Sequence, residues 1–227
     1  MDMELLLIRH GQPAWVNAHG LGDNDPPLTP LGRRQAGQAA ERVTGLEVDE
    51  VIASTARRAA QTAEPIAEAL GLPAQPEEGL WEIRPPDEWE GAPAEVVARA
   101  FKEWRRRPRA AWWQGPHGEP FGDFHSRVTS TIERLLAERG VTRNASDPDH
   151  LWDLDHDERR IVIVAHNGTN SVILSHLLGI EPQPWEWERF NSNHAAVTTL
   201  RTTPIANAAI WSLQHFSAID HLTEVSS

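Results

Sequence analysis

Three short apolar runs predict buried strands, at residues 5–8, 51–53 and 161–165. Each run is continuous rather than alternating with polar residues, which is typical of strands that are buried on both faces of a parallel sheet. We therefore expect these three strands to be central in the sheet and parallel to one another. Two later segments, 195–200 and 208–213, are candidates for further strands.

Helical patterns separate these strands. A helix is predicted over residues 30–43, where Thr29 can cap the first turn. Residues 55–70 are rich in alanine and also predict a helix, which Pro65 should kink or restart. A further helix is expected over 171–178. The alternation of strands and helices indicates an α/β fold, with three α/β/α layers and a mostly parallel central sheet.

Two segments depart from this alternation. Residues 84–121 are rich in Pro, Trp and Arg, and their helical stretch 94–104 is a candidate lid over the sheet edge. The Trp- and Arg-rich insertion at 104–113 has two interpretations: a lid that offers an aromatic face and cations to a substrate, or a basic surface turn with packed tryptophans, which we favour. Residues 142–160 are acidic but lack the Gly and terminal Glu of a calcium-binding loop, so we expect a solvated loop.

The composition is that of one globular domain spanning residues 1–227, because no repeat or linker divides the chain. The 21 Lys and Arg against 33 Asp and Glu give a net charge of −12, which argues against nucleic acid or an anionic membrane as a partner. Any anionic ligand must therefore be held by a local basic pocket. The chain has no Cys and no long apolar N-terminal stretch, and we expect a cytoplasmic protein, either a monomer or a homodimer.

Basic side chains and imidazoles follow the ends of the three predicted strands. Arg9 and His10 end the first strand, Arg57 and Arg58 follow the second, and His166 ends the third. Because ligands of open α/β sheets bind beyond the carboxyl ends of the strands, we expect two imidazoles and two guanidinium groups in one pocket. Such a pocket suits a phosphoryl group, since guanidinium groups neutralise its oxygens and an imidazole nitrogen can attack the phosphorus. A metal ion is then not needed for charge neutralisation, and we expect no metal and no cofactor.

Six short motifs accompany these residues. They are Arg9-His10-Gly11; Pro27-Leu28-Thr29 with Gly32 and Gln35-Ala36; Ser54 with Arg58-Ala59-Ala60-Gln61-Thr62-Ala63; Leu80-Trp81-Glu82; Trp89-Glu90-Gly91; and Val164-Ala165-His166. Each motif is weak alone, but together they resemble those of the histidine phosphatase superfamily, also called the phosphoglycerate mutase-like family. The resemblance runs from Leu5 to about Leu200, and it selects Arg58 rather than Arg57 as the pocket residue.

The resemblance implies a fold of the phosphoglycerate mutase type and a two-step phosphoryl transfer. His10 would attack the substrate phosphorus to form a phosphohistidine, which water then hydrolyses. Arg9, Arg58 and His166 would hold the phosphoryl oxygens, and Glu82 would protonate the leaving oxygen and later accept a proton from water. A pKa raised by partial burial would suit Glu82 to this role. The implied activity is that of a metal-independent phosphatase, acting on a small phosphorylated metabolite.

The chain departs from the family's pattern at several positions. Val16 stands where mutases have Asn, and Asn17, one position later, is a candidate phosphate contact instead. Between Glu82 and the Trp-Glu-Gly motif one residue is added and a Gly is missing, with Pro85-Pro86 in the gap. Asn167 follows the last motif where some branches of the family place an acidic Asp. Because an amide cannot donate that proton, Glu82 keeps the role of acid.

Two other functions stay open. A mutase of the family would protect the phosphohistidine from water and return the phosphoryl group to the product, but its His-Gly-Glu-Ser signature is missing from residues 10–13. A non-catalytic module that binds phosphorylated ligands is disfavoured, because the His and Arg residues of the motifs are all present.

Overall fold

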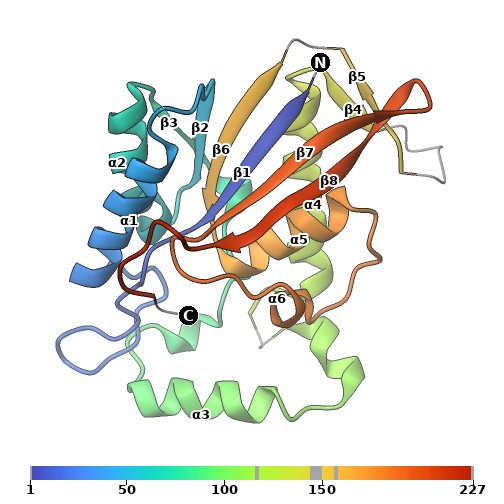
Figure 1. Cartoon of the computed structure of the whole chain (residues 1–227). Helices are drawn as coiled ribbons and strands as arrows, with labels where there is room; N and C mark the ends of the chain where they lie inside the picture. The colour runs from blue at the N-terminus through green and yellow to red at the C-terminus, as the bar shows by residue number, and fades with distance from the viewer. Residues whose placement is uncertain (1, 116–117, 144–149, 156–157, 226–227) are drawn as a thin grey trace.

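The three predicted central strands are adjacent and parallel in the sheet. A computed structural model describes residues 2–115, 118–143, 150–155 and 158–225. Strands β1 (Met3–Arg9), β6 (Arg159–Ala165) and β2 (Glu50–Ser54) lie side by side, and β3 (Ala74–Glu77) adds a fourth parallel strand beside β2 (Figure 1). The prediction of a buried parallel centre is therefore confirmed.

The other half of the sheet is antiparallel. β7 (Val197–Ile205) pairs with β1, β8 (Ala208–Ala218) pairs with β7, and the short strands β5 (Trp152–Leu154) and β4 (Val141–Arg143) complete this side. The sheet is thus mixed rather than mostly parallel, although the α/β class is confirmed. For β7 and β8 the reason lies in the turn at 206–207, where both residues have positive φ, 52° and 61°. Such a tight turn returns the chain beside the strand it has just left.

The acidic segment 142–160 contributes two of the antiparallel strands. Trp152 in β5 is only 1% exposed and belongs to a hydrophobic core. The prediction of a solvated loop was therefore wrong around this residue, because burying one large aromatic ring outweighs the charged positions beside it. Residues 144–149 and 156–157, with several of the segment's Asp side chains, lie outside the described residues.

Helices cover both faces of the sheet, which confirms the three-layer prediction. α1 (Pro30–Val43) and α2 (Arg57–Leu70) pack on one face, and α4 (Phe121–Ala137) and α5 (Asn167–Leu177) pack on the other (Figure 1). The sheet therefore separates two hydrophobic cores.

Strand β1 shows why its apolar run is continuous. Leu6 and Ile8 belong to the core beneath α1 and α2. Leu5 and Leu7 point the other way, into the core shared with α4 and α5. Because successive side chains of a strand alternate between faces, a strand that is covered on both sides needs an apolar residue at every position.

Local signals set the start of α1 and the end of α2, whereas the start of α5 differs from the prediction. Thr29 caps α1, its Oγ1 accepting a hydrogen bond from Gly32 N at 3.0 Å. The sequence predicts that Pro65 kinks or restarts α2, and the helix does not restart there but runs on as one helix. It ends at Gly71, whose φ of 67° is left-handed. α5 begins at Asn167, four residues before the predicted start, directly after His166.

The helix α3 (Ala94–Trp104), which coincides with the predicted helical stretch, lies away from the sheet at the foot of Figure 1. In the neighbouring insertion, Trp112 packs on Trp104 with ring centroids 4.3 Å apart, and Trp113 packs on Phe121 at 5.6 Å. Both tryptophans thus contact other aromatic rings, and Trp113 is still 39% exposed. The remaining short elements are α6 (Glu186–Arg189), η1 (Glu78–Leu80), η2 (Asp87–Trp89) and η3 (Arg109–Gln114).

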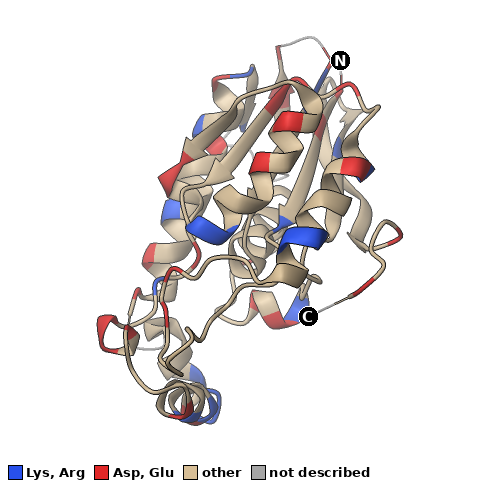
Figure 2. Cartoon of the chain, turned by 90° about the vertical axis from the view of Figure 1, so that its left-hand side faces the viewer, with Lys and Arg blue, Asp and Glu red and all other residues tan. Residues whose placement is uncertain are grey.

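Charged positions of both signs are interspersed over the surface helices and loops (Figure 2). The net negative charge of the chain is therefore spread out and not gathered on one element. Within the described part of the chain, no helix has both the length and the apolar character that crossing a membrane requires.

Candidate active site

The register of the two central strands brings two histidines together. Arg9 of β1 is level with Ala165 of β6, so the next residues, His10 and His166, leave the sheet at the same edge. Their ring centroids are 5.2 Å apart, and both rings are buried. His10 Nδ1 lies 2.7 Å from the carbonyl oxygen of Gly11, which can only accept a hydrogen bond. Nδ1 therefore carries the proton, and Nε2 is left with its lone pair.

His10 is held in its neutral form. Burial lowers the pKa of His10 well below the usual value of a histidine, and the positive charges of Arg58 and Arg9 and the His166 ring lower it further. An imidazole that is neutral at pH 7 keeps the lone pair that a nucleophile needs.

His166 has one nitrogen free for a ligand. Its Nε2 lies 2.9 Å from Ser54 Oγ, and this hydroxyl already accepts a hydrogen bond from Ala56 N at 3.3 Å. When the Ser54 hydroxyl donates its hydrogen to Nε2, the ring proton of His166 lies on Nδ1. That buried Nδ1 has no hydrogen-bond partner within the described structure, and it can donate to a phosphoryl oxygen.

Arg58 is a buried cation with free hydrogen-bond donors. Its side chain is 2% exposed, and Nε and Nη1 make no hydrogen bond within the described structure. Asp25 Oδ1 is 3.7 Å from Nη1, and the guanidinium carbon lies 5.0 Å from the ring of Trp15 and 5.7 Å from that of Trp81. The two indoles hold the planar group in place by cation–π contact. Arg57, by contrast, is 55% exposed and lies 3.8 Å from an Asp23 oxygen.

Two nitrogens of the Arg9 guanidinium contact residues of the loop before β7. Its Nη1 donates to the carbonyl oxygen of Ser192, and its Nη2 lies 3.0 Å from Nε2 of His194, whereas its buried Nε makes no hydrogen bond within the described structure. Burial lowers the pKa of Arg9 to about 10, so the guanidinium remains charged at neutral pH. Arg9 and Arg58 thus bring two positive charges to the cluster that they form with His10 and His166.

The carboxylate of Glu82 is held at the start of α5. Its Oε2 accepts a hydrogen bond from Gly168 N at 2.8 Å, and its Oε1 accepts one from Ile83 N at 3.0 Å. Burial raises the pKa of Glu82 above the usual value of a glutamate, although these hydrogen bonds oppose the rise. The extra residue before the Trp-Glu-Gly motif therefore does not keep Glu82 from the cluster.

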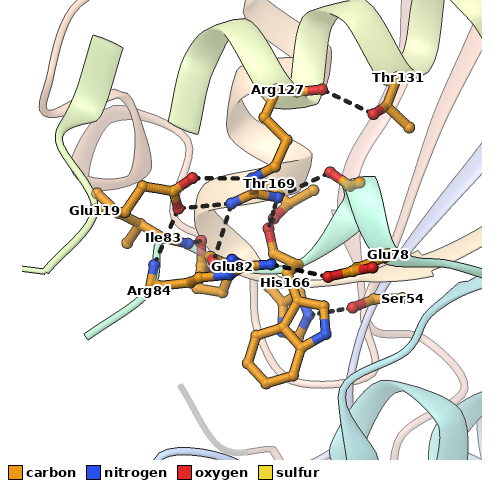
Figure 3. A network of polar contacts seen from close by, with 12 residues as sticks. Ser54, Glu78, Glu82, Ile83, Arg84, Glu119, Arg127, Thr131, His166 and Thr169 are labelled. Carbon is orange, nitrogen blue, oxygen red and sulfur yellow. Dashed lines mark hydrogen bonds and ion pairs between the residues drawn. The ribbon is translucent and has the colours of Figure 1, made fainter. Parts of the chain in front are cut away.

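An ion pair braces the segment that carries Glu82 (Figure 3). Arg127 of α4 forms a two-pronged pair with Glu119, with hydrogen bonds of 2.6 and 2.9 Å. The same guanidinium donates to the carbonyl oxygens of Gly79 and Trp81, at 2.9 and 3.0 Å. Sequence reasoning did not find Arg127.

Motif residues from the two following helices support the loop after His10. Gly11 N donates to Thr62 Oγ1 at 3.0 Å, and Gln12 N donates to Gln35 Oε1 at 2.9 Å. Gly32 approaches so closely that a Cβ there would lie 2.2 Å from the carbonyl oxygen of Gln12. These motif positions thus have a structural reason: they hold the backbone that presents His10.

Asn17 is not brought to this cluster. Its side-chain oxygen accepts hydrogen bonds from His19 N at 2.9 Å and Leu21 N at 3.2 Å, within an exposed loop. The residue is also absent from the walls of the adjoining cavity, where Trp15 and Val16 stand instead. The arrangement therefore does not support the predicted phosphate contact of Asn17.

A cavity of about 630 Å³ opens from the cluster. Arg9, Arg58 and Glu82 form its polar end, and most of its other walls are aromatic or aliphatic. No group of three or more His, Asp or Glu side chains suited to a metal ion occurs among the residues the structure describes. The polar end thus presents two guanidinium groups and one carboxyl group, next to the buried imidazoles of His10 and His166, and its two cations suit an anion.

A family model described as histidine phosphatase superfamily (branch 1) matches residues 5–145 and 149–210. The chain belongs to the histidine phosphatase superfamily. Its sequence is 26% identical over 230 residues to the probable phosphoglycerate mutase GpmB of Proteus mirabilis, covering 99% of this chain and 97% of that one. A GpmB from Yersinia pestis is 33% identical over 138 residues, which is 59% of this chain and 63% of the relative.

Solved structures of this superfamily share the fold. The mycobacterial glucosyl-3-phosphoglycerate phosphatase superposes with a TM-score of 0.70 at 28% identity, covering 96% of this chain and 100% of that one. The phosphoserine phosphatase of Entamoeba histolytica, in complex with 3-phosphoglyceric acid, gives a TM-score of 0.64 at 26% identity, covering 96% of this chain and 98% of that one. The chain is therefore an enzyme of the histidine phosphatase type.

Proposed function

We propose that this histidine phosphatase hydrolyses phosphate monoesters through a phosphohistidine on Nε2 of His10, without a metal ion. The observation that carries the proposal is the buried contact between the His10 and His166 rings, together with the unbonded nitrogens of His166 and Arg58. Nε2 of a neutral His10 lies beside His166, whose Nδ1 is unbonded, and Arg58 offers unbonded Nε and Nη1 within the described structure. The three side chains together can bind the oxygens and attack the phosphorus of one phosphoryl group.

The first step transfers the phosphoryl group to the enzyme. His10 Nε2 forms the N–P bond as the bond between phosphorus and the ester oxygen breaks. Glu82, which its raised pKa favours in the protonated form, gives its proton to that oxygen, and the alcohol leaves neutral. Arg9 and Arg58 balance the charge on the phosphoryl oxygens during the transfer.

The second step returns the enzyme to its starting state. Glu82, now a carboxylate, takes a proton from a water molecule as the water oxygen attacks the phosphorus. The N–P bond breaks, the electron pair returns to His10 Nε2, and inorganic phosphate leaves. Arg9 and Arg58 balance the negative charge of the phosphoryl oxygens in this cycle and His166 donates a hydrogen bond to them, which is why we propose that no metal ion takes part.

A mutase activity is the second candidate, because curated relatives carry that name. A mutase would return the phosphoryl group of His10 to the product and not to water. We rank it second because the chain lacks the mutase signature after His10.

We also propose that the partner is a small-molecule ester, with no nucleic acid or membrane, and that the protein is cytoplasmic, since a chain without Cys fits that compartment.

Phosphate release from p-nitrophenyl phosphate, measured with EDTA and without added metal, tests the proposal. We expect turnover that EDTA does not reduce and that His10→Ala abolishes. A strict need for a divalent cation, or activity in the His10 variant, would overturn the proposed chemistry. Isomerisation of 3-phosphoglycerate much faster than its hydrolysis would reverse the ranking of the two activities.

A further inference from the structure

One helix of the protein turns its apolar face to the cavity and not to a core. In α3, Ala94, Val97, Ala98 and Phe101 recur with the spacing of one helical face, and all four line the cavity. Phe101 is 44% exposed. An amphipathic helix ordinarily buries such a face, so this face is available to an apolar group that enters the cavity.

Aromatic rings continue this surface to the phosphate-binding end. Trp15 and Trp81, which flank Arg58, both line the cavity, and Trp15 is 48% exposed. Trp89 stands behind Phe101, with ring centroids 4.7 Å apart. A group attached to a phosphoryl on Arg58 would therefore meet indole and phenyl rings at once.

Charged and amide groups along this part of the cavity are already engaged. Arg105 forms an ion pair with Glu188, and Asp23 lies 3.8 Å from a nitrogen of Arg57. The amide of Asn24 donates to the Pro86 carbonyl oxygen at 3.2 Å, and that of Asn167 donates to the Trp187 carbonyl oxygen at 3.1 Å. Among the cations of the described lining residues, those at the phosphate end, Arg9 and Arg58, keep buried nitrogens without a hydrogen bond.

We infer that the ester has a bulky apolar organic group, with a ring and without a second charged group. This inference rests on the proposed function and names the substrate class of the same site. A substrate carboxylate or second phosphate would lose its water without gaining a free cation beside α3. A cavity of about 630 Å³ is also much larger than a phosphoryl group alone requires.

Three alkyl esters distinguish the effect of the apolar group on kcat/KM from the effect of the leaving group. The probes are 3-phenylpropyl phosphate, propyl phosphate and phosphoserine, each an ester of a primary alcohol. We expect kcat/KM for the phenylpropyl ester to exceed that of the other two by about 10-fold to 100-fold, the gain from burying one phenyl group. Phosphoserine has the best leaving group of the three, so chemistry alone would favour it.

Two variants on α3 locate the effect. Phe101→Ala should reduce the preference for the phenylpropyl over the propyl ester by about 10-fold, because it removes a ring that faces the cavity. Val96→Ala is the control, since Val96 is an exposed apolar residue of the same helix that does not line the cavity. The control should leave kcat/KM for both esters unchanged.

The outcomes distinguish this inference from the proposed function. Equal kcat/KM for the three esters, or a preference for phosphoserine, would overturn the inference and leave the phosphatase activity standing. If no ester is hydrolysed, the proposed function fails, and calorimetric binding of the phenylpropyl and propyl esters to the His10→Ala variant still decides the preference of the cavity. Tighter binding of the phenylpropyl ester supports the inference, and equal binding overturns it.

Discussion

The Glu82 carboxylate and the backbone of Gly168 are in direct contact. Gly168 N donates to Glu82 Oε2 at 2.8 Å, and a Cβ at position 168 would lie 2.3 Å from Glu82 Oε1. A side chain at this position of α5 would therefore displace the carboxylate. The absence of a side chain at position 168 is thus part of what positions the proposed acid.

Gly168→Ala should reduce kcat/KM for an alkyl phosphate by about 100-fold, the lower range of what a general acid contributes. The reduction should be smaller for p-nitrophenyl phosphate, whose leaving group needs no proton. Gly37→Ala is the matched control, because Gly37 lies in α1 and a Cβ there meets no atom within 4 Å. The control should keep full activity, and equal losses in both variants would contradict the role of the Glu82 contact.

Arg58→Lys should lower kcat/KM by about 100-fold to 1,000-fold, although the positive charge is kept. An ammonium cannot replace the planar guanidinium with its unbonded Nε and Nη1, nor can it stack in the same way between Trp15 and Trp81. The neighbouring Arg57→Lys provides the comparison, since Arg57 is exposed on the surface. Full activity in both variants would show that Arg58 does not bind the phosphoryl group.

The pH dependence of kcat/KM should report Glu82. Because burial raises the pKa of Glu82, the protonated form needed by an alkyl leaving group persists above the usual range and is lost as the pH rises through the raised pKa. We expect kcat/KM for propyl phosphate to fall over that range and kcat/KM for p-nitrophenyl phosphate not to follow it. Glu82→Gln should remove the difference between the two profiles. An unchanged difference would assign the proton to another group.

The stability of the fold should decrease in mild acid. The lowered pKa values of His10 and His166 mean that the unfolded chain takes up protons below about pH 6.5 that the folded chain does not bind. The free energy of unfolding should therefore fall with decreasing pH, by about 1.4 kcal/mol per pH unit for each histidine. Urea unfolding between pH 6 and pH 5 should show a smaller slope for His10→Asn than for the unchanged chain. Identical slopes would contradict a neutral buried His10.

Sequence reasoning found the elements that local patterns determine. The run 5–8 predicts a buried strand because all four of its side chains are apolar, and Thr29 marks the start of α1 because its side chain caps the first turn. Arg9 and His166 were placed at one sheet edge because parallel strands end at the same side. These inferences need only the neighbours of each residue along the chain.

Other features depend on contacts that leave no local pattern. The sequence predicts strands at 195–200 and 208–213, but their antiparallel pairing and the burial of Trp152 are set by packing across the sheet. Arg127 reaches its carbonyl partners from a helix more than forty residues away, at separations of 48 and 46 positions. Asn17 carries the residue type of a phosphate contact, but its oxygen is used by its own loop.

Trapping the phosphoenzyme tests the central claim most directly. Mixing the protein with excess p-nitrophenyl phosphate, quenching in alkali within milliseconds and digesting it for mass spectrometry should give one phosphoryl group on His10, and ³¹P NMR should place that group on Nε2. The His10→Ala variant should give none. A phosphoryl group on another residue, or steady turnover with no phosphoenzyme at any time, would contradict the account.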